Sequence, residues 1–208
     1  MKKKLLKNIK ELKKELKADD QIKFAFEVLE QAINEQIMEP KKLAPGFFET
    51  PAEVAGNANA VATFSDGGCR GNPGPGAWGI VVQEYDGSVV HEASDFKDYT
   101  TNNQMELTGA LKCMEYVKAN MPLKSDIYVY TDSKYVVDGM KTWVDGWKKR
   151  GWKKADRKAP ENLELWQSLD AIRHELGGVH FLWVKGHAGH PQNERCDELA
   201  NESMDANI

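Results

Sequence analysis

Four acidic side chains have positions that suggest a reactive or ligand-binding site. Asp66 follows the apolar run VATFS and Asp132 follows IYVYT, and both have small or polar neighbours rather than basic ones. Glu106 and Asp197 lie in helix-forming segments, the second of which reads NERCDELA. Carboxylates on inward positions without adjacent cations are costly unless a metal compensates their charge. These four residues are therefore candidate metal ligands, with helix caps and solvated charges as the alternative interpretation.

Local patterns predict the elements that position these residues. Runs of β-branched and aromatic residues predict strands over 61–65, 77–85, 88–96, 126–131 and 178–186. Periodic apolar residues predict helices over 102–120, with an Asn cap at its start, and over 135–144, 161–176 and 191–204. Three antiparallel strands followed by helix–strand alternation indicate an α/β fold with a five-stranded sheet. Ligands gather at strand ends in such folds, which is where Asp66 and Asp132 are expected.

The first sixty residues have a different pattern. Leu5, Ile9, Leu12 and Leu16 form one apolar stripe on a lysine-rich helix, and a second amphipathic segment ends at Pro40. Residues 40–60 are rich in Pro, Gly, Ala and Asn and lack periodicity. We therefore expect a helical N-terminal extension over 1–39, a linker over 40–60 and an α/β domain over 61–208.

Composition describes an ordinary globular protein with local concentrations of charge. The net charge is −4, 41% of the residues are hydrophobic, and no apolar run approaches the roughly 18–20 residues of a membrane span. We expect a soluble, cytoplasmic protein with no membrane partner. The acidic balance alone does not indicate a nucleic-acid binder. However, residues 1–17 hold eight lysines against two glutamates, and residues 143–158 hold seven cations against two aspartates.

Four motifs decide between the interpretations of the carboxylates. The runs SDGGCRGNPGPGAWG, TTNNQMEL, YTDSKYV and WVKGHAGHPQNERCDELAN occur in this order over about residues 61–204. Together they closely resemble the ribonuclease H family, type 1, of the bacterial kind. Four motifs in order are far more specific than one short match. The resemblance implies a ribonuclease H-like fold, with a mixed sheet of three antiparallel strands then parallel strands, flanked by helices and preceded here by the extension.

The resemblance also implies an activity and a cofactor. The family cuts the RNA strand of RNA–DNA hybrids, leaves 5′-phosphate and 3′-hydroxyl ends, and removes RNA primers and R-loops. Its four carboxylates correspond here to Asp66, Glu106, Asp132 and Asp197 and hold two Mg²⁺ ions, with Mn²⁺ as a substitute. Mg²⁺ prefers oxygen ligands, and two ions about 4 Å apart can bind the attacking water and the leaving oxygen. By the same resemblance, Asp66 would bridge both ions.

Other site residues are carried over from the family. His187, in the Gly-rich run KGHAGH, would handle a proton or assist product release, and Asn193 would hydrogen-bond near the site. Lys134 is a departure, because bacterial relatives often have Gln after DS. The residues expected to face the hybrid are Gly67, Cys69, Arg70, Asn72, Thr101, Asn102, Asn103 and Lys134.

The segment 143–158, WVDGWKKRGWKKADRK, resembles the basic handle of bacterial type 1 enzymes, which grips the DNA strand. Basic residues interleaved with Trp suit a phosphate backbone and exposed sugar or base faces. The alternative is a solvated charged face. The residues expected to bind here are Trp143, Lys148, Lys149, Arg150, Lys153 and Lys154. Trp78, Trp166 and Trp183 are expected in the core.

Several alternatives remain open at this point. A noncatalytic hybrid-binding module, a reverse-transcriptase ribonuclease H domain, and a DNA-directed nuclease or integrase of related fold are the rivals to a ribonuclease H. The N-terminal helices do not resemble the hybrid-binding domain of eukaryotic relatives. Three hypotheses for them compete: nonspecific hybrid affinity, binding of a partner or a second copy, and an inert solvated hairpin.

Overall fold

The computed structural model describes Phe26, Gly46, residues 48–186 and residues 188–208. The chain divides into two compact units, Met1–Ala44 and Pro45–Ile208, and every element below belongs to the second. The predicted helical extension over 1–39 lies outside the described residues except for Phe26. It therefore stays a prediction.

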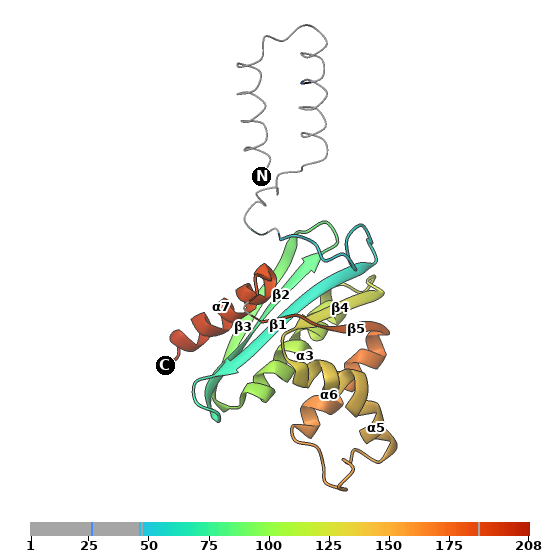
Figure 1. The fold of residues 1–208 in the computed structure, drawn as a ribbon, viewed down its shortest axis with the longest axis vertical. Helices are drawn as coiled ribbons and strands as arrows, with labels where there is room; N and C mark the ends of the chain where they lie inside the picture. Colours follow the sequence, from blue (N-terminus) through green and yellow to red (C-terminus); the bar gives the residue numbers. More distant parts are fainter. Residues whose placement is uncertain (1–25, 27–45, 47, 187) are drawn as a thin grey trace. The chain divides into compact units, whose positions relative to one another are not determined.

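Five strands form one mixed sheet in the second unit (Figure 1). They are β1 (Ala60–Cys69), β2 (Gly74–Glu84), β3 (Val89–Thr100), β4 (Asp126–Thr131) and β5 (Gly178–Trp183). The strand order is β3-β2-β1-β4-β5, with β1, β2 and β3 antiparallel and β1, β4 and β5 parallel. The predicted sheet is thus confirmed, and β1 is the central strand to which both halves pair.

The helices match the predicted segments with two differences. They are α3 (Asn102–Asn120), α4 (Lys134–Asp138), a π-helical turn (Gly139–Trp143), α5 (Val144–Lys149), α6 (Leu163–Leu176) and α7 (Pro191–Asp205). The single helix predicted over 135–144 is therefore a helix interrupted by the π-helical turn. The predicted Asn cap of α3 is wrong: Thr101 is the N-cap and its hydroxyl accepts from the Gln104 N–H at 3.3 Å. Asn102 is free for another contact because Thr101 satisfies the helix start.

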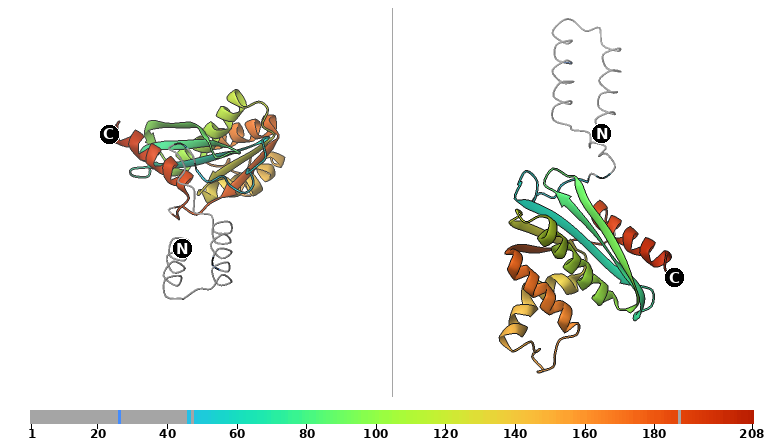
Figure 2. Two further views of the ribbon diagram at one scale, coloured as in Figure 1. Left: turned by 90° about the horizontal axis from the view of Figure 1, so that it is seen from above. Right: turned by 180° about the vertical axis from the view of Figure 1, so that it is seen from behind.

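The helices cover opposite faces of the sheet (Figure 2). Alternate residues of a strand point to opposite faces. Accordingly, Val61 packs in the cluster with α3 and α6, whereas Ala62 packs in the cluster with Leu199 of α7. Asp66 within β1 and Asp132 directly after β4 thus lie in a sheet that has helices on both faces.

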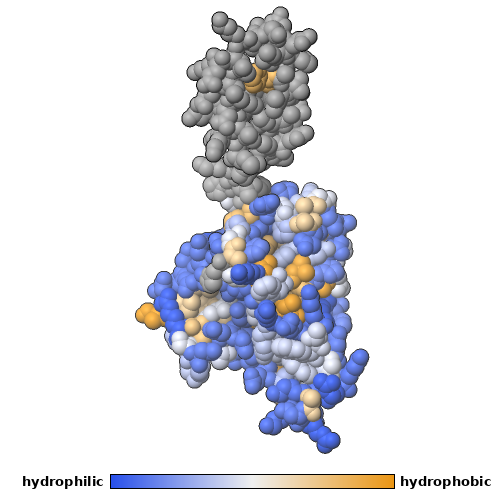
Figure 3. All heavy atoms as spheres, viewed as in Figure 1, coloured by the Kyte–Doolittle hydropathy of each residue, from blue (hydrophilic) through white to orange (hydrophobic). Residues whose placement is uncertain are grey.

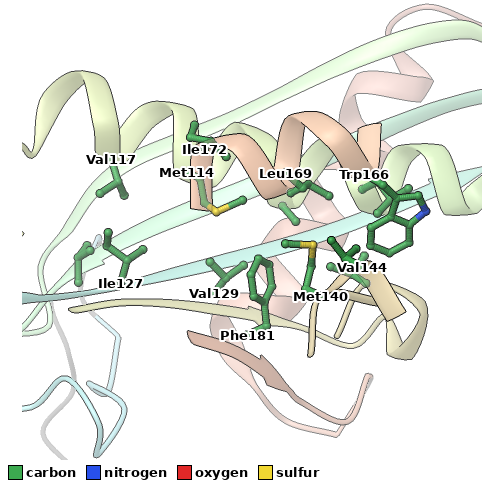
Figure 4. Close-up of a cluster of buried hydrophobic side chains, with 14 of the residues drawn as sticks. Met114, Val117, Ile127, Val129, Met140, Val144, Trp166, Leu169, Ile172 and Phe181 are labelled. Carbon is green, nitrogen blue, oxygen red and sulfur yellow. The ribbon is translucent and has the colours of Figure 1, made fainter. Parts of the chain in front are cut away.

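The larger core lies between the sheet and the pair α3–α6 (Figure 4). Trp166 of α6 is fully buried and lies edge-on to Trp147 at 5.6 Å between ring centroids. A Cβ on Gly139 would lie 2.1 Å from the Trp166 ring, so the π-helical turn fits against the indole only because residue 139 is glycine. The predicted core position of Trp166 is confirmed.

Part of the segment predicted as a linker packs on the sheet. We call residues 48–55 the strap. Val54 of the strap is fully buried in the cluster on the α7 face, together with Phe64 and Tyr130. The Tyr130 hydroxyl donates to the carboxylate of Glu53 at 3.0 Å. The α/β unit therefore includes residues upstream of the boundary at 61 that the sequence predicts.

The surface seen in Figure 3 is largely hydrophilic, with isolated apolar residues. The large apolar side chains exposed in the described residues are Tyr85, Val90, Tyr99, Leu123, Trp183 and Ile208. No helix in the part of the chain that the structure describes is long and apolar enough to cross a membrane.

Close contact of α7 with β2 depends on Gly79. A Cβ at this residue would lie 2.1 Å from the Cys196 carbonyl oxygen, which is backbone and cannot move aside cheaply. We expect Gly79→Ala to lower the free energy of unfolding by about 1–3 kcal/mol, measured by urea denaturation. Gly68→Ala is the control, because nothing lies within 4 Å of a Cβ there. Equal stability of the two variants would contradict this account of α7 packing.

Candidate active site

Asp66 and Asp132 come together because β1 and β4 are parallel and in register. The last registered pair is Ser65 with Thr131, and each carboxylate belongs to the residue that follows. Asp132 follows the end of β4 as predicted, whereas the predicted strand end at Asp66 is wrong. Residues 67–69 continue to pair with β2, so β1 extends to Cys69 and Asp66 lies within it, opposite Gly79. The two carboxylates still come from neighbouring positions on adjacent strands. The Gly67 backbone N–H donates to Asp66 Oδ1 at 2.7 Å, which fixes the orientation of that carboxylate.

Glu106 joins this pair from the second turn of α3. A Cβ on Gly67 would lie 2.4 Å from the Met105 carbonyl carbon and 2.5 Å from the Glu106 nitrogen. The backbones of β1 and α3 are therefore in direct contact at Gly67. This contact brings the Glu106 side chain close to Asp66, and any larger residue at 67 would push the helix away.

Asp66, Glu106 and Asp132 form a compact acidic cluster. One carboxylate oxygen from each lies within 4.8 Å of the others. Burial, followed by the negative charges of Asp66 and Asp132, raises the pKa of the Glu106 carboxyl well above its ordinary value. Without a cation, these three groups destabilise one another when all are ionised.

The donor set fits a divalent cation. All three candidate ligands are carboxylates, and hard cations such as Mg²⁺ and Ca²⁺ prefer oxygen ligands. Glu106 Oε2 is buried and has no hydrogen-bond partner among the described residues. A buried carboxylate oxygen in this condition is costly, and a bound cation would satisfy it.

Asp197 is placed on α7 outside the group of three, as far as the described residues show. Its Oδ1 accepts a hydrogen bond from Asn201 Nδ2 at 2.9 Å, one turn along the helix. Asn193, at the third position of α7, is buried, and its Oδ1 has no partner in the described part of the chain. The role of Asp197 as a metal ligand stays a prediction.

His187 lies outside the described residues, so its predicted role is not tested. The flanking loop is described on both sides. A Cβ on Gly186 would lie 2.2 Å from Asp132 Oδ2, so the loop backbone lies directly against the cluster. Sequence reasoning did not single out Gly186, although a glycine directly before the candidate histidine was a usable signal.

Residues 69–72 and the start of α3 are joined by polar contacts. The Cys69 backbone N–H donates to Asn102 Oδ1 at 2.8 Å, and the Asn102 N–H donates to Asn72 Oδ1 at 3.4 Å. The structure thus brings together three of the residues predicted to face the hybrid, while Asn103 is exposed beside them. Arg70 instead forms an ion pair with Asp205 at the end of α7.

Trp183 contacts both the acidic cluster and Lys134. Its Nε1 donates to the Asp132 backbone carbonyl at 2.9 Å, and Lys134 Nζ lies 5.0 Å from the centre of the indole ring. The predicted core position of Trp183 is wrong, because the residue is 45% exposed. It occupies the last position of β5, whereas Val184, the next residue of the apolar run, is buried in the cluster on the α7 face.

The basic segment 143–158 is partly tied into the core. Trp143 packs against Trp147 and Trp166, and Lys148 pairs with Asp170 at 2.7 Å, whose side chain is nearly buried. Of the predicted contact residues, Lys149, Arg150 and Lys153 are exposed and Lys154 is half-buried. The Trp residues therefore hold the segment in place, and the exposed cations remain available to a ligand.

Comparison with known proteins agrees with this geometry. The family model described as RNase H matches residues 58–205. This range includes the acidic cluster, the glycines at 67 and 186 that contact it or its helix, and α7. The chain belongs to the ribonuclease H family. Ribonuclease H of Rhizobium meliloti (strain 1021) is 50% identical over 145 residues, covering 70% of this chain and 90% of that protein. Ribonuclease H of Paracoccus denitrificans (strain Pd 1222) is 48% identical over 151 residues, covering 70% and 93%.

Solved structures of type 1 enzymes of this family are also similar. LC9-RNase H1, described as a type 1 RNase H with the type 2 active-site motif, gives a TM-score of 0.63 at 34% identity, covering 72% of this chain and 74% of that one. LC11-RNase H1, solved in complex with an RNA/DNA hybrid, gives 0.57 at 28% identity, covering 70% and 97%. The predicted fold, family and ribonuclease H enzyme class are confirmed.

The electrostatics of the cluster make a prediction for the metal-free protein. A raised pKa of Glu106 in the folded state means that ionisation opposes folding, so stability falls as the pH rises above the unfolded pKa. We expect Glu106→Gln to raise the free energy of unfolding in EDTA at pH 7, because glutamine has nearly the same shape and carries no charge.

The same substitution should remove part of the pH dependence. Wild-type protein in EDTA should gain stability relative to Glu106→Gln as the pH is lowered from 7 toward 5, measured by urea denaturation. Glu115→Gln, at an exposed ion pair on α3, is the control and should do neither. A variant less stable than wild type at pH 7 would contradict mutual repulsion in the cluster.

Proposed function

We propose that the chain is an endonuclease that hydrolyses the RNA strand of RNA–DNA hybrids and leaves 5′-phosphate and 3′-hydroxyl ends. The observation that carries this proposal is the cluster of Asp66, Glu106 and Asp132 in a chain of the ribonuclease H family. A structural neighbour is described in complex with an RNA/DNA hybrid, which supports the substrate class. Action in the cytoplasm, on primers and R-loops, belongs to the same proposal.

The expected metal ligands are all carboxylates. Asp66, Glu106 and Asp132 would hold divalent cations, with Mg²⁺ as the expected ion, Mn²⁺ as a substitute, and Asp197 as a further ligand of a second ion. Bound in this way, two ions would polarise the phosphodiester, activate water and stabilise the leaving 3′ oxygen. Asp66, on the central strand, would be one of the residues that hold these ions.

The protein residues around the cluster would orient the substrate and move protons. The Gly67 N–H keeps Asp66 oriented, and the Trp183 indole N–H fixes the backbone that carries Asp132. His187 would accept or deliver a proton at the leaving or attacking oxygen, since a histidine titrates near neutral pH. Asn193, buried with an unsatisfied amide oxygen, would hydrogen-bond within the site.

Recognition of the hybrid would use two surfaces. The loops at 69–72 and 101–103, which are linked by hydrogen bonds, would use backbone groups and amides to contact the 2′-hydroxyls that distinguish RNA from DNA. Exposed cations at Lys149, Arg150 and Lys153 would contact phosphates of the DNA strand. Lys134, held over Trp183, would contact a further phosphate.

Cleavage should depend on the cluster while folding and hybrid binding do not. We expect Asp66→Asn and Asp132→Asn each to reduce hydrolysis of a labelled hybrid by at least about 10³-fold, because these ligands support the charge that develops in the transition state. Circular dichroism and a binding assay should show a folded protein that still binds the hybrid. Retained cleavage by either variant would contradict the proposed role of the cluster.

A parallel substrate comparison separates the rival functions. Wild-type protein is offered labelled hybrid, RNA duplex and DNA duplex with Mg²⁺ or Mn²⁺, and only the RNA of the hybrid should be cut. Cleavage of DNA duplex would favour a DNA-directed nuclease. Binding without cleavage under all conditions would favour the noncatalytic hybrid-binding module.

Metal binding can be measured without substrate. A ligand that binds only the native state raises the free energy of unfolding, and with it the melting temperature. The gain is about 2.7 kcal/mol when the ligand concentration is 100 times the dissociation constant. We expect millimolar Mg²⁺ to stabilise the wild-type chain against thermal unfolding relative to EDTA, and Asp66→Asn to lose most of this effect. Asp98→Asn, at an exposed position on β3, is the charge-matched control and should keep it. Equal Mg²⁺ stabilisation in Asp66→Asn would place the cation elsewhere.

A further inference from the structure

The strap is joined to the sheet by a buried glutamine. Gln83 of β2 is fully buried, and its Nε2 donates to the Phe48 carbonyl at 2.8 Å and to the Gly87 carbonyl at 3.1 Å. The Phe48 backbone N–H in turn donates to the Gly87 carbonyl at 3.2 Å. One end of the strap is thus fixed to β2 and to the turn that follows it.

A second buried glutamine connects this anchor to α7. Gln192 is 5% exposed, and its Nε2 donates to the Glu49 carbonyl at 2.8 Å and to Gln83 Oε1 at 3.1 Å. The two side-chain amides and the strap carbonyls therefore form one continuous hydrogen-bonded network. Because both glutamine side chains are buried, loss of the Gln192 donor leaves the Gln83 amide oxygen without this hydrogen bond in a buried position.

Gln192 occupies the second position of α7, between the loop at 186–190 and Asn193. His190, the N-cap of this helix, makes no side-chain capping hydrogen bond. Within the chain around the helix start, the Gly189 N–H donates to Glu194 Oε1 at 3.1 Å. The contacts of Gln192 with the strap and Gln83 anchor the same turn from outside the helix. The strap precedes residues 58–205, the part that the family model matches.

We infer that Gln192 is a positioning residue for the proposed reaction, and that the strap is the surface against which it acts. The anchor holds the first turn of α7, so that Asn193 and the loop next to Asp132 keep their places relative to the acidic cluster. This inference rests on the proposed function only for its effect on catalysis. The anchoring of α7 is measurable on its own.

Gln192→Met and Gln192→Glu test the inference in the full chain. Both keep the side-chain length and remove the donor. We expect kcat for hybrid cleavage to fall about 10-fold while KM changes less than about 2-fold, because small displacements of site groups cost rate more than binding. Amide hydrogen exchange at the Glu194 N–H, which donates to the His190 carbonyl at 3.0 Å, should become at least about 5-fold faster.

A control for general destabilisation is Ile172→Ala in α6, in the core cluster on the other face of the sheet. All variants are compared well below their melting temperatures. Ile172→Ala should lower the melting temperature while leaving kcat and Glu194 exchange at wild-type values. Wild-type kcat in Gln192→Met, or an equal loss in Ile172→Ala, would overturn the positioning role.

The exchange measurement separates the two proposals. If wild-type protein does not cleave the hybrid, the proposed function fails, and faster Glu194 exchange in Gln192→Met still supports the anchor. Unchanged exchange in both Gln192 variants overturns the anchor whether or not the chain is active.

Discussion

Mutual repulsion among three carboxylates is the constraint on which the site depends. Asp66, Glu106 and Asp132 would separate if their side chains alone decided, since each raises the cost of ionising the others. The backbone prevents this separation. The parallel register of β1 and β4 fixes two of them, and the direct contact of β1 with α3 at Gly67 fixes the third. The energy of the core is therefore used, in part, to hold an unfavourable charge cluster ready for cations.

The two faces of the sheet are covered by different helical layers, which contribute differently to the site. The α3–α6 side supplies most of the apolar packing, including Trp166, and carries Glu106. The α7 side approaches so closely that Gly79 leaves room only for a hydrogen, and it carries Asp197 and Asn193. The acidic cluster itself is built from β1, α3 and the residue after β4, so its three carboxylates come from the sheet and the α3 layer.

Much of this arrangement can be predicted from the sequence. Carboxylates directly after apolar runs indicate sites at the ends of parallel strands, so the closeness of Asp66 and Asp132 could be predicted from local patterns. The strand end predicted before Asp66 was wrong, because the Gly-rich residues 67–69 continue β1 through their pairing with β2. The position of Trp183 could not be predicted in this way, because an indole within an apolar run indicates a buried residue. Only the register of β5 with β4 shows that Trp183 lies beside Asp132. The bounds of α3 were predicted, but its N-cap was misassigned, because Thr and Asn are both good caps and Asn102 instead accepts from the Cys69 N–H across the loop.

The strap shows why pattern and packing can disagree at a boundary. Residues 40–60 lack periodicity, yet Val54 is fully buried, because its partners come from β1, β4 and α7 rather than from its own segment. The family model matches from residue 58, downstream of this contact. The region that the family model matches therefore begins later in the chain than the region that packs into the core. A chain cut at the start of the homologous region would leave the aromatic pair Phe64 and Tyr130 without Val54, and would expose to water a surface that the longer chain keeps dry.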